Sequence, residues 1–327
     1  MRYVLLFLPL ASCAFGDGAL FFPPGYPVTE TDQIAVIKWE NQREELIMRI
    51  KFEGDPSDFT WIVPTPTEPT VDSAGVGLFY GLSDFTKPIY KRRGWSCDDG
   101  GIYLFHPIGR GELSVDSSEV EIIGEGTVGV LAYQILRADD PLVLHRFLMD
   151  SGYHYPEGAD SIFASYIDKN WFYWVAARVD TTQVSALYYG HLGIHLEFTT
   201  AEPVYPLRVS RLSSEGSSVT LYVVASHRMH FERAQLKFAS RITAEDIQYM
   251  REHFYYGYED LLDLLEESSF LTKLVRYVPE EDMDDITLRV APDDREYREV
   301  IFYSGLPILP VLVIVRMMKR RKSGKAQ

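Results

Sequence analysis

The sequence contains few of the residues that build disulfide scaffolds and thiolate metal sites, since only two of its 327 residues are cysteine. Two cysteines cannot form a disulfide-rich framework or a four-thiolate zinc site. Basic residues are also scarce, with 32 Lys and Arg against 47 Asp and Glu, which gives a formal net charge of −15. A chain this acidic repels phosphate backbones, so the composition argues against a nucleic-acid partner.

The sequence patterns of well-known enzyme sites are missing as well. There is no Gly-x-Ser-x-Gly elbow, His-Glu-x-x-His helix, phosphate-binding loop or dinucleotide fingerprint. We therefore predict no catalytic residue, no cofactor and no metal ligand from the sequence. A site assembled from residues far apart in the chain would leave no such pattern. An extracytoplasmic hydrolase or metal-assisted enzyme is consequently kept as the alternative function.

What the chain does contain is enough apolar surface to fold. Apolar residues make up 46% of the sequence and aromatic residues 13%, whereas charged residues make up only 24%. A chain of this length and composition can bury a substantial core, so intrinsic disorder is a poor description of it. The sequence has no repeat of fixed period.

The N-terminus has the pattern of a secretory signal, with Arg2 before an apolar run over residues 3–10 and small residues at 11–14. The run is too short to span a bilayer, which needs about 20 apolar residues. We predict a signal peptide over residues 1–16. Two cleavage patterns are open, Ala14-Phe15-Gly16 and a lipobox, Leu10-Ala11-Ser12-Cys13.

The chemical state of the two cysteines depends on which of the two cleavage patterns is used. If ordinary cleavage leaves Cys13 in the mature chain, Cys13 and Cys97 can form a disulfide outside the cell. If Cys13 is lipidated, or if cleavage follows Gly16, Cys97 is left unpaired. The sequence does not decide between these states.

The C-terminus has the pattern of a membrane anchor. Residues 300–315 are uncharged and mostly apolar, and a cluster of six cations follows: Arg316, Lys319, Arg320, Arg321, Lys322 and Lys325. Sixteen residues at ~1.5 Å rise give about 24 Å, short of the ~30 Å hydrocarbon core. Extension to residues 297–318, with Tyr297 at one interface, closes the gap. We predict a transmembrane helix there and a basic cytoplasmic tail at 319–327. A buried strand with a basic tail is the alternative.

The distribution of charge favours the membrane interpretation. Arg2 and the six cations of the tail hold 7 of the 32 basic residues and none of the acids. Residues 3–315 therefore carry 25 basic and 47 acidic residues, a net charge of −22. An acidic body joined to a basic tail by an apolar segment follows the positive-inside rule. We expect a single-pass protein of the cell membrane whose body is extracytoplasmic.

Alternation of apolar and polar residues predicts half-buried strands at 33–39, 45–52 and 59–63, joined as a meander. Pro64, Pro66 and Pro69 are expected to end the pairing. Asp140-Pro141 is a helix-start signal. Further strands are predicted within 119–136, with a break at Gly124-Glu125-Gly126, and at 171–179, 192–198, 204–212 and 219–226. Helices are predicted at 142–150, 161–169 and 247–274, the last with a break near Gly257.

These elements predict an α+β fold: a strand-rich, sandwich-like ectodomain with inserted helices and a C-terminal transmembrane helix. The expected organisation after the signal peptide is a strand-rich ectodomain over 17–245, and a helical region with an acidic stalk over 246–296. The anchor follows at 297–318 and the basic tail at 319–327.

Histidines and acidic runs are the candidate metal ligands of the sequence. His191 and His195 are four apart, which on a strand separates them by about 13 Å, too far to share one metal. His227 and His230 would face opposite sides of a strand. Two acidic groups have oxygen ligands suited to calcium, but not the ligand spacing of a calcium loop: Asp98-Asp99 and Glu280, Glu281, Asp282, Asp284, Asp285. We expect solvated acidic surface there.

Residues 51–66 (KFEGDPSDFTWIVPTP) resemble the hallmark of an uncharacterised prokaryotic family, domain of unknown function 2330. Collinear matches follow at 78–90 (LFYGLSDFTKPIY), 148–156 (LMDSGYHYP), 171–179 and 202–208 (EPVYPLR), so the resemblance covers residues 17–240. It implies structural roles for eight residues of its motifs: Gly54, Asp55, Phe59, Trp61, Pro64, Pro66, Tyr205 and Pro206.

What the resemblance implies about function is limited. Members of the family look secreted or membrane-anchored, and no activity, cofactor or catalytic residue carries over. The family's cysteine-rich segments are reduced here to Cys13 and Cys97, which weakens any disulfide argued by analogy. Our leading hypothesis is therefore a non-enzymatic surface protein, with a structural role or an unknown protein or glycan partner.

Overall fold

The computed structural model describes residues 19–21, 32–51, 60–75, 77–92, 121–129, 131–153, 155–179, 191–214, 216–253 and 259–303. The predicted signal peptide, cytoplasmic tail and most of the anchor lie outside these residues. So do Cys13, Cys97, Gly54, Asp55, Phe59 and Asp98-Asp99.

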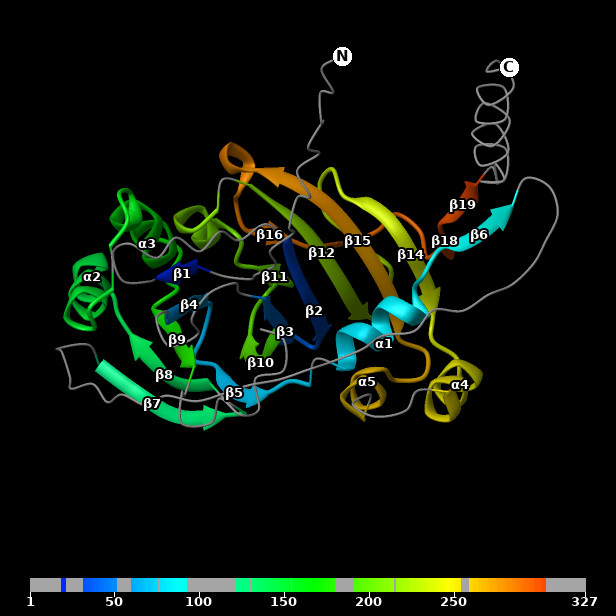
Figure 1. Ribbon diagram of the computed structural model, residues 1–327, viewed down its shortest axis with the longest axis horizontal. Helices are drawn as coiled ribbons and strands as arrows, with labels where there is room; N and C mark the ends of the chain where they lie inside the picture. Colours follow the sequence, from blue (N-terminus) through cyan, green and yellow to red (C-terminus); the bar gives the residue numbers. More distant parts are fainter. Residues whose placement is uncertain are drawn as a thin grey trace, which may run out of the picture.

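The chain has a strand-rich α+β fold with two open sheets (Figure 1). The larger has eight strands, in the order β18 (Tyr297–Arg298), β14 (Gln235–Arg241), β15 (Phe270–Pro279), β12 (Gly216–Ala225), β2 (Asp32–Glu40), β3 (Arg43–Lys51), β10 (His191–Thr199) and β5 (Thr70–Ser73). The smaller has five, in the order β1 (Ala19–Phe21), β4 (Thr60–Thr65), β9 (Tyr173–Val179), β8 (Leu131–Arg137) and β7 (Glu121–Val128).

Short strands and helices complete the fold. Three two-stranded pairs are formed by β11 (Val204–Tyr205) with β16 (Ile286–Thr287), β13 (Met229–His230) with β17 (Arg289–Val290), and β6 (Ile89–Arg92) with β19 (Val300–Tyr303). The helices are α1 (Gly77–Phe85), α2 (Pro141–Asp150), α3 (Ala159–Ile167), α4 (Ala244–His253) and α5 (Glu259–Leu264), with 3-10 turns at Arg208–Leu212 and Glu280–Asp282.

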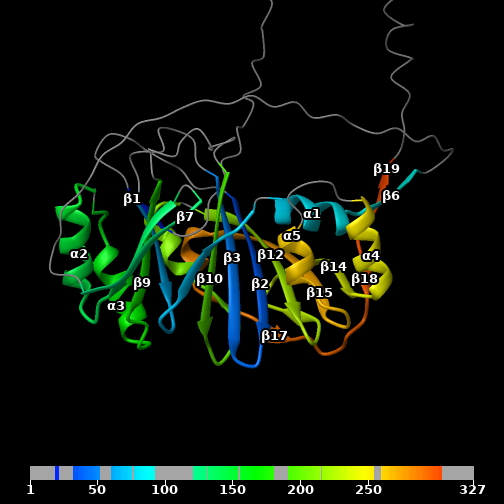
Figure 2. The same ribbon diagram turned by 90° about the horizontal axis from the view of Figure 1, so that it is seen from below.

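Three apolar clusters hold these layers together. The first draws side chains from both sheets, for example Leu46 of β3 and Trp61 of β4, so the sheets face each other across a shared core. The second lies between the outer face of the five-stranded sheet and α2 and α3, around Trp174. The third lies between the eight-stranded sheet and α1, α4 and α5 (Figure 2). Both sheets are therefore covered by helices on their outer faces, but only in part.

Strong local signals predicted their elements correctly. The hairpin β2–β3 turns at Asn41 and Gln42, whose φ angles of 52° and 64° are those of a two-residue hairpin turn. Helix α2 begins where Asp140 accepts a hydrogen bond from the backbone N–H of Leu142 (2.9 Å), with Pro141 in its first turn.

Other predicted elements are wrong. Within the helix expected over 247–274, the described residues form α4 and α5, which ends at Leu264, and residues 270–279 form β15, a strand inside the large sheet. The strand expected over 204–212 is β11 followed by a 3-10 turn. Strand β4 does not continue a meander from β3, because it pairs with β1 and β9 in the other sheet. Gly124 and Gly126 lie inside β7, and the turn to β8 comes at Gly129 instead.

Pro64 does not end its strand. It lies within β4, opposite Trp174 of β9. Among the described residues, β1 pairs only with residues 60–62, so β4 has a single neighbour at Pro64, and a residue without a backbone N–H is tolerated there.

The prediction of a solvated acidic stalk over this part of the chain is also wrong. Met283 and Leu288, from the stretch expected to be solvated, are buried in the core between the sheets. Of the predicted anchor, residues 297–298 and 300–303 form β18 and β19 rather than helix, and 304–318 lie outside the described residues. Among the residues described, none of the helices has the length and apolar character needed to cross a bilayer.

Candidate functional site

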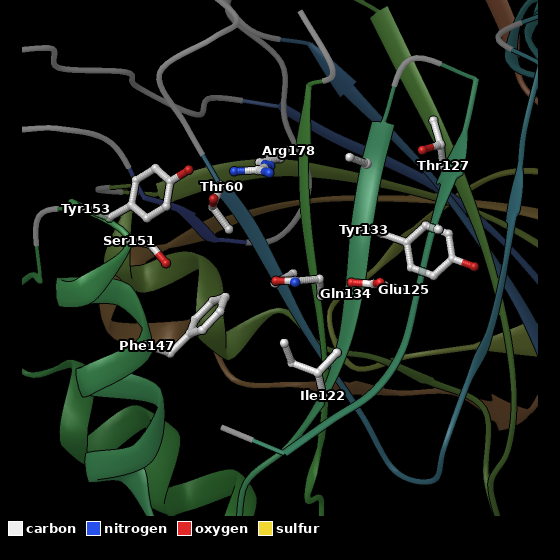
Figure 3. Close-up of a pocket in the computed structure, with 13 residues that line it drawn as sticks. Thr60, Ile122, Glu125, Thr127, Tyr133, Gln134, Phe147, Ser151, Tyr153 and Arg178 are labelled. Atoms are coloured by element: carbon white, nitrogen blue, oxygen red, sulfur yellow. The ribbon is translucent and has the colours of Figure 1, made fainter. Parts of the chain in front are cut away.

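A cleft of about 560 Å³ opens on the outer face of the five-stranded sheet, where α2 and α3 leave the sheet uncovered. We call it the outer cleft (Figure 3). Its volume falls within the range of small-molecule sites. It is lined by Thr60, Ile122, Glu125, Gly126, Thr127, Ala132, Tyr133, Gln134, Phe147, Ser151, Tyr153, Ala176 and Arg178.

Strand register explains the floor of the cleft. Side chains two residues apart share one face of a sheet. One row across the sheet runs Thr60, Arg178, Ala132 and Thr127, and the next runs Ala176, Gln134 and Glu125. Each row contains one alanine among polar residues, so polar groups project from the floor of the cleft.

The wall of the cleft comes from α2 and the turn after it. Phe147 is on the last turns of the helix, and Ser151 and Tyr153 follow its end. The chain turns there at Gly152, with φ of +81°, where a glycine carries no steric cost. Figure 3 shows Phe147, Ser151 and Tyr153 on the helix side, facing Thr60 and Gln134 on the strand side.

The two charged side chains of the cleft lie at its opposite ends. Arg178 and Glu125 are two strands apart and offset by two residues, which places their Cα atoms about 12 Å apart. Within the described part of the chain, neither has an ion-pair or hydrogen-bond partner. A guanidinium and a carboxylate at this spacing can bind a polar ligand that carries an anionic group at one end and donors at the other.

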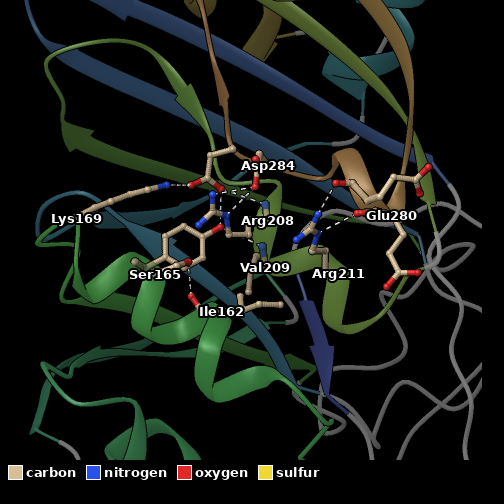
Figure 4. Close-up of polar contacts among 11 residues, drawn as sticks. Ile162, Ser165, Lys169, Arg208, Val209, Arg211, Glu280 and Asp284 are labelled. Carbon is tan, nitrogen blue, oxygen red and sulfur yellow. Dashed lines mark hydrogen bonds and ion pairs between the residues drawn. The ribbon is translucent and has the colours of Figure 1, made fainter.

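The acidic segment, residues 280–285, is a second charged region (Figure 4), and its three aspartates are paired with cations. Asp282 accepts from Arg233 and Arg276, each at 2.9 Å. Asp284 accepts from Arg208 at 2.8 Å. The backbone carbonyls of Glu280 and Glu281 accept from Arg211. The acidic side chains at 282, 284 and 285 are therefore bound to cations rather than simply solvated.

Asp285 is the most buried acid of this segment, with its side chain 6% exposed. It accepts hydrogen bonds from the Tyr166 hydroxyl (2.6 Å), the Lys169 ammonium (2.7 Å) and the backbone N–H of Arg208 (3.1 Å). The Tyr166 oxygen in turn accepts from the N–H of Val209. Burial, and then the Asp285 charge, raise the pKa of the Tyr166 hydroxyl well above its usual value, so it stays a donor.

The residues of the family motifs contribute to both regions. Trp61 is fully buried between the sheets, and its neighbour Thr60 lines the outer cleft. The matching segments 148–156 and 171–179 supply further lining residues: Ser151, Tyr153, Ala176 and Arg178.

Segment 202–208 joins the large sheet to the acidic segment. Tyr205 is buried and donates to Gln33 (2.7 Å), and Pro206 is buried beside it. Pro66 is half-buried after β4. The backbone N–H of Val204 donates to Glu44, whose complete burial raises the pKa of its carboxyl well above the usual range. These contacts are structural, and they leave Arg208 facing Asp284.

The histidines that the structure describes do not gather into a site. His195 lies on β10, with Nε2 3.4 Å from Glu45 Oε2, and His227 Nδ1 lies 2.8 Å from Asp294 Oδ2. His230 is an exposed residue of β13. Over the described ranges, no group of three His, Cys, Asp or Glu side chains is placed to hold a metal ion.

No pattern in the sequence predicted the outer cleft. Its charged residues, Arg178 and Glu125, come from strands far apart in the chain, and neither stands in a recognisable pattern. The only available signal was that three segments of the family resemblance (51–66, 148–156 and 171–179) each contain lining residues.

Comparison with known proteins gives one strong result. The family model described as "Uncharacterized protein conserved in bacteria (DUF2330)" matches residues 10–289. No curated protein matches the chain. Among solved structures, the crystal structure of baculovirus P35 aligns at 9% identity and a TM-score of 0.36, over 86% of this chain and 100% of that one.

The caspase-8/P35 complex aligns at 8% identity and a TM-score of 0.30, over 80% of this chain and 96% of that one. Scores this low support no argument about fold or function. The family match is different in kind, because it extends from the predicted signal peptide through the acidic segment. This protein therefore belongs to the DUF2330 family.

Proposed function

We propose that this protein is a membrane-anchored, extracytoplasmic binding protein that takes an acidic glycan in the outer cleft. The observation that carries the proposal is the cleft itself, where Arg178 and Glu125 have no partner among the described residues. Charged groups that the fold does not use are available to a ligand.

The chemistry of the lining favours a glycan. Sugar hydroxyls are both donors and acceptors, and the amide of Gln134 and the hydroxyls of Thr60 and Ser151 can serve either role. The half-buried ring of Tyr153 offers an apolar face to a sugar ring. The guanidinium of Arg178 suits a carboxylate, as in a uronic acid.

A peptide fits the cleft less well. Extended peptides usually bind by adding a strand to a sheet edge, where backbone groups are free. The floor of the outer cleft is the face of a sheet, so it presents side chains rather than backbone N–H and C=O groups.

Binding is tested with a stated probe. Isothermal titration of the full chain with a short oligogalacturonate should give saturable binding, and the neutral galactose oligomer should bind much more weakly. Arg178→Met should weaken oligogalacturonate binding at least tenfold, which is about 1.4 kcal/mol. Arg251→Met, an exposed arginine on α4, is the matched control and should bind as the wild type. Equal binding by both variants would reject the cleft as the site.

The membrane topology is supported by the charge distribution and the apolar ends of the sequence, and it is tested separately. Protease added to intact cells should digest the acidic body and spare the basic tail. A fully protected body would reject the extracytoplasmic orientation, whatever the outcome of the binding experiment.

A further inference from the structure

The last described strand forms an exposed ribbon at the edge of the molecule. Strand β19 leaves the large sheet after β18 and pairs in parallel with β6 over four residues. We call β6 and β19 the C-terminal ribbon; it stands beyond β14 and β18, away from the two sheets (Figures 1 and 2). Five large apolar side chains on it are exposed: Ile89 (42%), Tyr90 (62%), Val300 (37%), Ile301 (37%) and Phe302 (63%).

Both faces of the ribbon carry exposed apolar side chains. Register and alternation put Ile89, Val300 and Phe302 on one face, and Tyr90 and Ile301 on the other. Parallel strands are normally covered on both faces, and an isolated two-stranded pair is marginal in water. A ribbon of this kind is therefore expected to be more stable when an apolar environment covers its exposed side chains.

The root of the ribbon is fixed to the body. Arg298 donates to the backbone carbonyl of Phe85 (2.8 Å), and its guanidinium lies over the ring of Phe238. Lys237 forms an ion pair with Glu299 (2.7 Å), and the Glu299 carbonyl accepts from the N–H of Ile89 (2.8 Å). The apolar residues beyond this root project from a defined position rather than from a free end.

We infer that the C-terminal ribbon is a membrane-contact surface that inserts into the headgroup region of the bilayer. The inference rests on the proposed anchor. From Tyr303 the chain runs directly into the apolar residues 304–315 and the basic cluster that begins at Arg316. Tyrosine and phenylalanine suit the membrane interface, and the exposed Lys91, in register with Phe302, is placed to reach lipid phosphates.

The ribbon has a consequence for the rest of the molecule. A flexible linker to the anchor would leave the body free to rotate, whereas a ribbon rooted at Arg298 and Glu299 and held in the interface fixes which side of the body faces the lipid. The bilayer, rather than another protein, is favoured because the ribbon is continuous in sequence with the predicted anchor.

Photolabelling tests the inference. The full chain is reconstituted in vesicles of phosphatidylcholine and phosphatidylglycerol that contain a phosphatidylcholine with a diazirine near its glycerol end. Labelled peptides are then identified by mass spectrometry. Peptides with residues 89–92 and 300–303 should be labelled several-fold more than the peptide with Tyr277, which is 67% exposed on β15. The Tyr90→Ser/Phe302→Ser variant should lower ribbon labelling several-fold, and Tyr277→Ser should not.

The outcomes separate this inference from the proposed anchor. Label on 304–318 without label on the ribbon would overturn the ribbon's role and leave the anchor standing. A chain that carries no label in either segment, and that alkaline carbonate extracts from the vesicles, would overturn both. A ribbon that cross-links to a second copy in place of lipid would overturn the inference in favour of a dimer.

Discussion

The outer cleft and the acidic segment use charge in opposite ways. In the acidic segment, Asp282, Asp284 and Asp285 each have a cationic partner within 3 Å. In the outer cleft, Arg178 and Glu125 lie on the same face of the sheet but are too far apart to form an ion pair, and no other described residue pairs with them. The paired charges of the acidic segment connect residues that are far apart in the chain. The two charges of the outer cleft remain accessible to a ligand.

This difference separates stability from binding. A buried carboxylate whose partners are removed is costly, because its desolvation is no longer offset. An exposed charge without a partner contributes little to folding and can be removed at almost no cost. Removal of the buried acid of the acidic segment, Asp285, should therefore destabilise the protein strongly, whereas substitutions in the outer cleft should change only what it binds.

The largest effect is expected for Asp285→Ala. The change removes the acceptor of Tyr166, Lys169 and the Arg208 N–H, and should lower the free energy of unfolding by about 3–5 kcal/mol. Urea denaturation measures it. Asp284→Ala is the control: its side chain is 65% exposed, so the loss should stay below about 1 kcal/mol. Equal losses would show that burial does not distinguish the two acids.

The same contacts explain what could be predicted from the sequence. The hairpin β2–β3 and helix α2 depend on neighbours in the chain, such as Asn41 and the Asp140-Pro141 pair, and both were predicted. A solvated stalk was the wrong prediction for the acidic segment, because the partner of Asp285, Lys169, is 116 residues away and no local pattern indicates the pair.

Strand β15 was missed for a different reason. It has an apolar core on each side, with Leu274 facing the other sheet and Leu271 facing the helices. A strand buried on both faces loses the alternation that identifies strands, and its apolar run resembles a helix. The outer cleft was not predictable either, because register between distant strands, rather than spacing in the sequence, assembles its floor.

A smaller loss is expected for Tyr166→Phe. The Tyr166 oxygen donates to Asp285 and accepts from the Val209 N–H, so the change leaves two buried groups short of a partner. The free energy of unfolding should fall by about 2 kcal/mol. Tyr155→Phe is the matched control, because the Tyr155 hydroxyl donates to an exposed acid, Asp160. If both variants lost the same amount, the buried network would add nothing beyond a surface hydrogen bond.

Glu44 differs from Asp285 in that it is a buried acid with no cationic partner among the described residues. Burial raises its pKa in the folded protein, whereas the unfolded chain has the usual value of about 4.3. Between these two pKa values only the folded state holds the proton, so the wild type loses stability as pH rises, by about 1.4 kcal/mol for each unit.

Glu44→Gln removes this dependence and keeps an acceptor for the Val204 N–H. Urea denaturation from pH 4 to pH 8 should show that the free energy of unfolding of the variant rises relative to that of the wild type as pH increases. The two proteins should differ little at the acidic end of the range. A constant difference between the two proteins across the range would mean that the carboxyl does not titrate as its burial requires.

The smallest effect on stability is expected for a substitution in the outer cleft. This substitution tests most directly whether the charges of the cleft, unlike those of the acidic segment, are dispensable for folding. Arg178→Met removes a cation that has no partner among the described residues, so the free energy of unfolding should stay within about 0.5 kcal/mol of the wild type. Arg276→Met removes one of the two guanidinium groups on Asp282 and should cost about 1.5 kcal/mol. A cleft variant as damaging as Arg276→Met would mean that Arg178 serves the fold. A stable variant that has lost oligogalacturonate binding would assign this arginine to the ligand.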